Sequence, residues 1–406
     1  MSNTSALLTE EVSLANWVGA VKRSELQEML SKASRPGVIS FALGLPAPEL
    51  FPRAALSRAA ASVLASDVRS LQYGPQSQVL KLQIVELMAQ RGVKCHVDQV
   101  FLTGGAQQGM NLLARLLLDK GGQVLVEEMI YTGFQQVIEP YQPNLLTVRT
   151  DPETGMDVSA LESILGRGAR PAFIYAISDG HNPLSVSLSL HKRERLVALA
   201  RKYHIPIMED DAYGFLYYGA TCVPPLRAFD DQWVFYIGSF SKTLGPGLRS
   251  GWIVLPERLI PKLSIVKEAS DIDTTTFAQR TIASFLETED FNQHLVGLRR
   301  EYKMRRDVML CSLRDYFPSQ ARWRVPDTGL FIWVELPSEV DAATMLKVAI
   351  EKEQVAFIPG RAFSVNGSCH ARNCVRLNFS NSSPELIKIG IERLAKAIES
   401  YERESN

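Results

Sequence analysis

The sequence lacks an excess of charge of either sign. Its 406 residues include 44 lysines and arginines and 44 aspartates and glutamates, so the formal net charge is zero. A neutral chain has no overall attraction for nucleic acid or for an anionic membrane, and we expect neither as a partner. No apolar run approaches the ~18 residues that span a bilayer, and the first residues lack the basic and apolar regions of a signal peptide. These absences predict a soluble, cytoplasmic protein.

Cysteine is scarce as well. The five cysteines include no CxxC pair, and their odd number is typical of a reducing compartment rather than of a disulfide framework. Cys369, His370 and Cys374 lie close enough in sequence to suggest a metal cluster, but the chain has no matching second pair. We therefore expect buried or loop thiols and no metal site.

The chain is too long for one compact domain, because a single hydrophobic core stops growing at roughly 250–300 residues. Its composition, 46% hydrophobic and 22% charged, is that of an ordinary folded protein. We expect an N-terminal arm with part of a small domain over residues 1–58. A large domain is expected over 59–290 and a C-terminal small domain over 291–406.

Short apolar runs alternate with helical patterns between residues 99 and 255. Strands are expected at 99–103, 123–126, 172–177, 206–209, 234–238 and 252–255. Helices are expected between them at 108–118, 158–165 and 192–203. This alternation predicts an α/β fold whose mostly parallel sheet is covered on both faces and binds ligands beyond the carboxyl ends of its strands. After residue 260 the pattern changes to a smaller α+β domain.

The strongest chemical signal is the string at residues 238–249, Gly-Ser-Phe-Ser-Lys-Thr-Leu-Gly-Pro-Gly-Leu-Arg. An expected strand runs into Ser239, Ser241 and Lys242, then into a glycine-containing loop and Arg249. A lysine whose pKa is lowered can form a Schiff base with an aldehyde. Hydroxyls and a guanidinium are the donors that a phosphate dianion needs. An isolated Ser-x-Ser-Lys would fit a surface loop better, but the complete string favours a cofactor site.

This string resembles the cofactor-lysine motif of fold type I pyridoxal-phosphate (PLP) enzymes, specifically class I/II aminotransferases. Residues 40–52, Ser-Phe-Ala-Leu-Gly-Leu-Pro-Ala-Pro-Glu-Leu-Phe-Pro, are similar to a signature of the aminoadipate and kynurenine aminotransferase subgroup. Further matching segments follow in the family's order at 71–73, 103–108, 209–213 and 375–377. The resemblance covers nearly the whole chain. It implies the PLP-dependent transferase fold type I, with a seven-stranded sheet, PLP as cofactor and a free L-amino acid as substrate.

The resemblance also implies roles for the residues at matching positions. Lys242 would hold PLP as a Schiff base and later move the Cα proton. Asp210 would pair with the pyridine nitrogen, and Tyr213 and Asn182 would donate to the 3-oxygen. The phosphate would be held by Gly104, Gly105, Ala106, Gln107, Ser239, Ser241 and Arg249. Taken alone, a capping role for Asp210 or a plain turn around the glycines stays open.

Other matching positions concern the substrate and a second subunit. Arg376 would pair with the substrate α-carboxylate next to Gly44, and Tyr131 would stack on the cofactor ring unless it is a core aromatic. Tyr73 would reach the phosphate held by a partner subunit. We therefore expect a homodimer with shared active sites.

Several departures from the family pattern fall on the substrate side. The family's Asn-Pro-Thr-Gly reads Asn-Pro-Leu-Ser at 182–185, and Ala106 replaces a small hydroxyl residue. Gln27 stands where the dicarboxylate-using subgroup has an arginine. Acidic or hydrogen-bonding residues expected near the substrate are Glu10, Glu11, Glu25, Asp179 and His181. We expect a substrate with a neutral or cationic side chain, for example an arginine-like one, although these groups could instead face solvent.

Transfer of the amino group to a 2-oxo acid is the simplest expected reaction. The alternative is elimination, cyclisation or oxidation of an arginine-type amino acid, for example of hydroxyarginine to a cyclic guanidino amino acid in secondary metabolism. A non-catalytic regulator is a third possibility, since some transcription factors carry an aminotransferase-like domain behind a winged helix. Only residues 1–39 precede the 40–52 motif, and the chain is not basic, so we do not favour a regulator.

Overall fold

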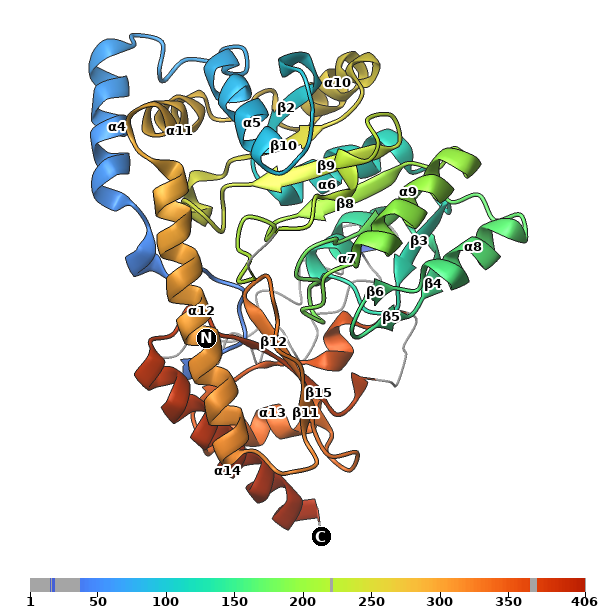
Figure 1. The fold of residues 1–406 in the computed structure, drawn as a ribbon, viewed down its shortest axis with the longest axis vertical. Coiled ribbons are helices and arrows are strands. Elements are labelled where there is room, and N and C mark those ends of the chain that lie inside the picture. The colour runs from blue at the N-terminus through green and yellow to red at the C-terminus, as the bar shows by residue number, and fades with distance from the viewer. Residues whose placement is uncertain (1–14, 16, 19–36, 220–221, 366–370, 406) are drawn as a thin grey trace.

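The computed structural model describes residues 15, 17–18, 37–219, 222–365 and 371–405. Two sheets carry most of the strands, and helix α12 (Phe291–Tyr316) runs from the neighbourhood of one to that of the other (Figure 1). Several residues singled out in the sequence lie outside the described residues: Glu10, Glu11, Glu25, Gln27, Cys369 and His370.

The larger sheet has seven strands in the order β2-β10-β9-β8-β7-β3-β4. Their bounds are β2 Val100–Thr103, β3 Gln123–Glu127, β4 Asn144–Val148, β7 Phe173–Ala176, β8 Ile207–Asp211, β9 Val234–Ser239 and β10 Gly251–Val254. β10 runs antiparallel to both of its neighbours, and the other pairs are parallel. The expected mostly parallel seven-stranded sheet is therefore confirmed.

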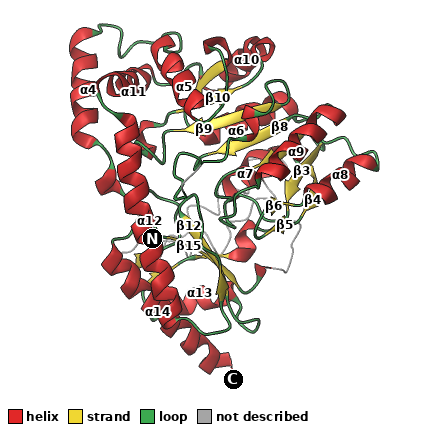
Figure 2. Cartoon of the chain, in the orientation of Figure 1, coloured by secondary structure: helices red, strands yellow, loops and turns green. Residues whose placement is uncertain are grey.

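Helices cover both faces of this sheet, as Figure 2 shows. One face packs against α6 (Ala106–Leu117), α7 (Thr132–Ile138) and α10 (Ile260–Asp271). The other packs against α8 (Val158–Gly166) and α9 (Leu190–Tyr203). Double coverage explains why the central strands are nearly continuous apolar runs. The edge strand β4 begins on the exposed Asn144 and is only partly buried, which is why its sequence did not stand out as a strand.

The smaller sheet is antiparallel, in the order β11-β12-β15-β14. Its strands are β11 Arg322–Trp323, β12 Phe331–Glu335, β14 Ile358–Pro359 and β15 Cys374–Asn378. α12, α13 (Ala342–Glu351) and α14 (Pro384–Ser405) share a hydrophobic core with it. β1 (Ile39–Ser40) pairs in parallel with β13 (Val355–Ala356), so distant parts of the chain meet here.

Three more helices and a hairpin complete the described elements. α4 (Arg53–Ser66), α5 (Gln78–Gln90) and α11 (Thr276–Thr288) pack together beside the large sheet, and β5 (Thr150–Asp151) forms a hairpin with β6 (Gly155–Met156). The domain boundaries at residues 58 and 290 stay a prediction.

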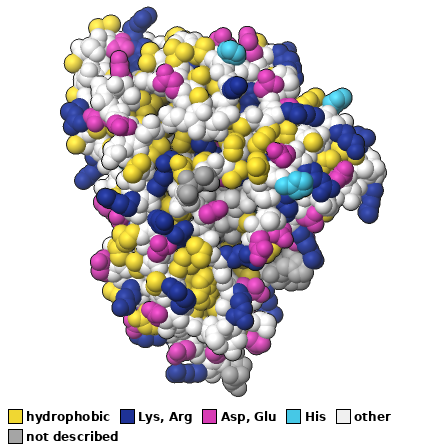
Figure 3. Space-filling model, in the orientation of Figure 1, with side chains coloured by type: hydrophobic (Ala, Val, Ile, Leu, Met, Phe, Trp, Pro, Cys, Tyr) yellow, Lys and Arg dark blue, Asp and Glu magenta, His cyan; other side chains and the backbone are white. Residues whose placement is uncertain are grey.

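The surface matches the balanced composition. Acidic and basic side chains are interspersed over the face drawn in Figure 3, with no large area of one sign. Among the described residues, none of the helices combines the length and the apolar character that crossing a membrane requires.

Candidate active site

The candidate site lies where β8 and β9 end. β8 closes on Glu209, Asp210 and Asp211, all three buried. Because side chains alternate along a strand, Asp210 faces the opposite side of the sheet from Glu209 and Asp211. The chain leaves β9 at Ser239 and reaches Lys242 three residues later. Neighbouring strand ends thus bring a carboxylate and a lysine to the same edge, as expected for ligand binding in such a sheet.

Lys242 is held by a backbone carbonyl. Its Nζ donates a hydrogen bond to the carbonyl oxygen of Gly44 at 2.7 Å. Burial lowers the pKa of Lys242 to about 8; the positive charges of Arg376 and Arg249 act in the same direction, and Asp210 opposes them. A large fraction of this amine is therefore neutral in mildly alkaline solution, where it can act as a nucleophile or accept a proton.

Asp210 presents one free oxygen. Its Oδ2 accepts a hydrogen bond from the Tyr175 hydroxyl at 2.8 Å, whereas Oδ1 is buried and has no partner among the described residues. Burial raises the pKa of Asp210 to about 6, against the opposing effect of the Tyr175 hydrogen bond. A buried polar atom without a partner is costly, so the free oxygen is suited to a ligand that brings an N–H donor. The protonated ring nitrogen of PLP is such a donor.

An anion-binding concavity lies at the start of α6. The N-cap residue Gly105 has φ 103° and offers no side chain to cap the first N–H groups of the helix. A Cβ on Gly105 would lie 3.1 Å from Nη2 of Arg249, so the guanidinium stands over the helix N-terminus. Ser239 is the last residue of β9 and Ser241 follows it, with their hydroxyls 2.9 Å apart. Ser239 pairs with Gly251 of β10, which packs against the backbone of Gly105. N–H groups, a helix dipole and a guanidinium together suit a phosphate.

Two of the expected phosphate contacts have other partners in the structure. The N–H of Gly104 already donates to Oε1 of Gln108 at 2.7 Å, so we leave Gly104 out of the proposed cradle. The side-chain amide of Gln107 donates to the carbonyl of Gly133 at 2.8 Å, which leaves its backbone N–H for a ligand.

Arg376 is a buried cation that has no acidic partner among the described residues. It projects from β15, and its Nη1 and Nη2 donate to Oδ1 of Asn182 at 2.7 Å and to the carbonyl of Ala42 at 2.6 Å. Its Nε has no hydrogen-bond partner in the part of the chain that the structure describes. The guanidinium centre lies 4.1 Å from the ring centroid of Phe331 and 4.8 Å from that of Phe363. Burial lowers the pKa of Arg376 to about 10, so the site is prepared for an incoming anion.

Aromatic rings bound the space between these polar groups. The Tyr213 ring meets Phe331 edge to face at 5.9 Å, and burial raises the pKa of the Tyr213 hydroxyl, which therefore keeps its proton. Tyr131 stands at the start of α7, and burial raises the pKa of its hydroxyl too, with the negative Asp210 acting in the same direction. A Cβ on Gly133 would collide with the Tyr131 ring, so this glycine lets the ring lie against the helix.

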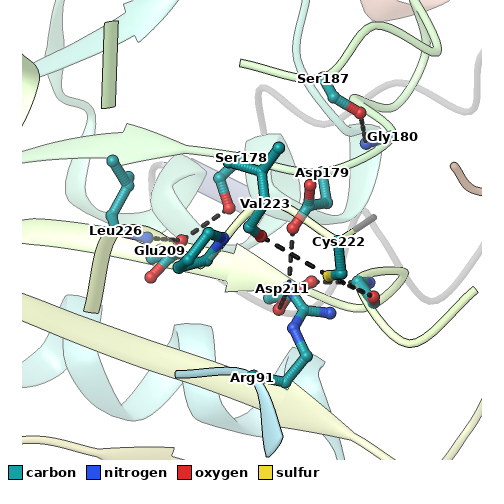
Figure 4. Close-up of polar contacts among 12 residues, drawn as sticks. Arg91, Ser178, Asp179, Gly180, Ser187, Glu209, Asp211, Cys222, Val223 and Leu226 are labelled. Atoms are coloured by element: carbon teal, nitrogen blue, oxygen red, sulfur yellow. Dashed lines mark hydrogen bonds and ion pairs between the residues drawn. The ribbon is translucent and has the colours of Figure 1, made fainter. Parts of the chain in front are cut away.

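Asp179 and His181 do not face this space with free groups. Asp179 pairs with Arg193 at 2.7 Å. It also pairs with Arg91 at 2.8 Å, and Arg91 reaches Asp211 at 3.0 Å (Figure 4). His181 is buried against Glu127, with 3.1 Å between Nε2 and Oε2. Their polar atoms are already satisfied inside the protein. We therefore do not include them among the proposed substrate contacts.

Sequence reasoning missed Tyr175 and Arg91. Tyr175 lies within the apolar strand β7, where a lone hydroxyl was the available signal of a buried hydrogen bond. Arg91 follows α5, and nothing near it in sequence points to the two aspartates it joins. Tyr73, by contrast, was expected at a subunit contact and is 75% exposed in this single chain.

Comparison with known proteins agrees with this geometry. A family model described as "Aminotransferase class I and II" matches residues 38–394. Aromatic-amino-acid aminotransferase 1 of Thermococcus litoralis is 35% identical over 387 residues, which cover 93% of this chain and 92% of that protein.

Solved structures give the same result. Kynurenine aminotransferase of Pyrococcus horikoshii superposes with a TM-score of 0.91 at 31% identity, covering 98% of this chain and 99% of the other. The α-aminoadipate aminotransferase of Thermus thermophilus, complexed with N-(5'-phosphopyridoxyl)-L-leucine, has a TM-score of 0.88 at 34% identity, covering 96% and 98%. The fold, the free oxygen of Asp210 and the buried lysine agree with these matches: the chain belongs to the class I and II aminotransferases and is a PLP-dependent transaminase of fold type I.

Proposed function

We propose that this aminotransferase acts on amino acids with an uncharged, mainly apolar side chain and passes their amino group to a 2-oxo acid. The observation that carries the proposal is that each charged group acting on Lys242 already has an expected partner in the substrate or the cofactor. Two cations, Arg376 and Arg249, lower the pKa of Lys242. Arg376 is suited to the substrate α-carboxylate, and Arg249 is suited to the cofactor phosphate. Among the described residues, no other cation contributes to the lowered pKa of Lys242.

Neither Asp210 nor Asp179 is left to pair with a positively charged group at the end of a substrate side chain. Asp210 shares its Oδ2 with Tyr175, and its free oxygen is reserved in this proposal for the cofactor ring. Asp179 is already paired with two arginines. The contacts of these described residues therefore do not favour an arginine-like substrate. They favour the other expected class, amino acids with a neutral side chain. The aromatic walls formed by Phe331 and Phe363 suit an apolar side chain.

The proposed roles follow the geometry of each group. PLP, when bound, supplies the electron sink that stabilises negative charge at the substrate Cα. Lys242, with its lowered pKa, takes up and returns the Cα proton. Arg376 and Asn182 orient the α-carboxylate. Asp210 would hold the ring nitrogen, Tyr213 and Asn182 would donate to the 3-oxygen of the ring, and Tyr131 would stack on the ring.

The phosphate is assigned to the concavity at the start of α6. Its proposed ligands are the N–H groups of Ala106 and Gln107, the hydroxyls of Ser239 and Ser241, and Arg249, with Gly105 allowing close approach. Gly44 contributes its carbonyl to Lys242 and so helps to place the amine.

The names of similar proteins include this substrate class and an acidic one. One relative is an aromatic-amino-acid aminotransferase, and the α-aminoadipate aminotransferase, which is named for an acidic substrate, was solved with a leucine adduct of the cofactor. These relatives are transaminases, which favours transamination over the elimination, cyclisation or oxidation of an arginine-type substrate.

Substrate profiling tests the proposal. We expect kcat/KM for phenylalanine or leucine to exceed that for glutamate, 2-aminoadipate and arginine, with pyruvate and 2-oxoglutarate tested separately as acceptors. A higher kcat/KM for either charged class would refute the proposed preference. Turnover of arginine without any 2-oxo acid would refute transamination as the main reaction.

We also propose a homodimer. Apolar side chains in and near the loop after α4 are exposed in the single chain: Val68 by 99%, Leu71 by 77% and Tyr73 by 75%. Such a group of apolar residues is unusual on a monomer surface, and a second copy would cover it. Sedimentation should give twice the chain mass, and Tyr73→Ala should weaken PLP binding if Tyr73 reaches the partner's site. A monomer at micromolar concentration with full activity would contradict this proposal.

A further inference from the structure

Asp210 is held from the neighbouring strand. β7 and β8 run parallel with Tyr175 opposite Met208, so Tyr175, Met208 and Asp210 lie on one face of the sheet. The Tyr175 hydroxyl donates to Oδ2 of Asp210 at 2.8 Å, with both residues buried. This contact ties down one carboxylate oxygen and leaves Oδ1 without a partner among the described residues.

Tyr175 is itself fixed by packing. Its ring stacks on Phe134 of α7 with centroids 3.7 Å apart and an interplanar angle of 2°, and only 1% of the residue is exposed. Burial, with the nearby charge of Asp210, raises the pKa of the Tyr175 hydroxyl well above its ordinary value. The hydroxyl therefore keeps its proton and acts only as a donor toward Asp210 across the working pH range.

We propose that Tyr175 is a positioning residue: it fixes the rotamer of Asp210 and stabilises its ionised form, so that the free Oδ1 is aimed at the nitrogen of the cofactor ring. This inference rests on the proposed role of Asp210 and adds the residue that sets its orientation and charge. Without the hydroxyl, Oδ2 would lose its buried donor, and the carboxylate would ionise less readily and could rotate.

Several other charged or titratable groups act on Asp210. Asp211, the next residue of β8, disfavours its ionisation, and Lys242, beyond β9, favours it. The hydroxyls of Tyr131 and Tyr213 also interact with its charge. Tyr175 is the one residue in this group that makes a hydrogen bond to Asp210 among the described residues. The effect of the Tyr175 hydroxyl on Asp210 should therefore be separable from the electrostatic effect of the surrounding charged groups.

The chain offers a matched control on the opposite face of the sheet. Tyr236 of β9 is equally buried and donates to Oδ2 of Asp211 at 2.9 Å. Both Tyr175→Phe and Tyr236→Phe remove one hydroxyl that donates to a buried aspartate of β8. Only the first should affect a ligand at Asp210. Because phenylalanine retains the ring, the stack on Phe134 is preserved.

The experiment compares full-length wild type, Tyr175→Phe and Tyr236→Phe. Apoprotein of each is titrated with PLP to measure Kd, and the acid limb of the pH profile of kcat/KM is recorded. For Tyr175→Phe we expect Kd to rise about tenfold, which is the loss of one hydrogen bond to a charged group. We also expect its acid limb to move up by about one pH unit, because a larger part of Asp210 is protonated. Tyr236→Phe should stay within about twofold of wild type in both measurements, because its hydroxyl serves the other aspartate.

Asp210→Asn supplies a second test. If Tyr175 acts through Asp210, adding Tyr175→Phe to Asp210→Asn should change the Kd for PLP little further. Equal Kd values and pH profiles for Tyr175→Phe and wild type would overturn the inference. The same shifts in Tyr236→Phe would overturn it too, because they would show a general loosening of the sheet. Failure of the wild type itself to bind PLP would instead refute the proposed role of the site.

Discussion

Replacing Arg376 by lysine separates the effect of charge from that of geometry. The structure gives the guanidinium two fixed anchors, Asn182 and the carbonyl of Ala42, which leave further N–H groups for a ligand. A lysine keeps the positive charge, but it is a point donor and cannot satisfy both anchors and both oxygens of a carboxylate. We therefore expect Arg376→Lys to retain a folded site that binds the substrate carboxylate through one contact instead of two.

The magnitude follows from the contact that is lost. One hydrogen bond between charged groups contributes about 1.5–3 kcal/mol, which corresponds to a roughly 10- to 150-fold fall in kcat/KM. Arg376→Gln removes the charge as well. Leaving a buried carboxylate unpaired costs about 3–5 kcal/mol, so the fall should be larger for this variant.

The assay uses two matched substrates. Steady-state kcat/KM is measured for the best amino acid and for the corresponding amine, which lacks the α-carboxylate. Both variants should lose activity toward the amino acid while activity toward the amine stays near the wild-type value. Two results would refute the reasoning: a loss below about threefold in Arg376→Lys, well under the fall expected for one charged hydrogen bond, or equal losses for the amino acid and the amine.

Three further predictions follow from the same contacts. Arg91→Leu leaves Asp211 without its cation and should lower the free energy of unfolding, measured by urea denaturation, by about 3–5 kcal/mol. Adding Asp211→Asn should recover part of this loss. Wild-type stability of the single variant would contradict the ion pair. Gly105→Ala adds a Cβ 3.1 Å from Arg249 at a φ of 103° and should weaken PLP binding more than tenfold, measured by titration of the apoprotein; unchanged binding would count against the phosphate cradle. Because burial lowers the pKa of Lys242 from 10.5 to about 8, the folded protein binds fewer protons than the unfolded chain between these values, and the stability contribution of Lys242 rises with pH there. The apoprotein of Lys242→Met should therefore be more stable than wild-type apoprotein at pH 7, with a gap that narrows by pH 10, and a constant gap would disprove the lowered pKa.

Much of the fold could be predicted from local patterns. The runs at 99–103, 123–126 and 234–238 became β2, β3 and β9 within a residue or two, because strands buried on both faces must be apolar along their length. The edge strand β4 was missed because one side of it faces solvent and its pattern is mixed. The expected residues Lys242, Asp210 and Arg376 lie on or just after strands, where side chains are held by a rigid framework.

Partner choice could not be predicted in the same way. Asp179 was expected near the substrate because it stands three residues before Asn182, yet its charge is compensated by Arg91 and Arg193. Those arginines lie 88 and 14 residues away along the chain, and neither separation is visible as a pattern. Glu10 and Gln27 lie outside the described residues, so their expected substrate contacts stay predictions.

The sequence by itself determined the family, the cofactor and the order of the functional residues, because each motif is a short string whose residues act together locally. Only the tertiary structure decided which carboxylate is free and which is engaged. Strand alternation turns Asp210 and Asp211 to opposite faces, and burial then leaves one oxygen of Asp210 bare while Arg91 and Tyr236 occupy Asp211. The pKa of Lys242 depends on burial and on charges from distant segments of the chain. Neither can be inferred from the residues next to Lys242 in the sequence.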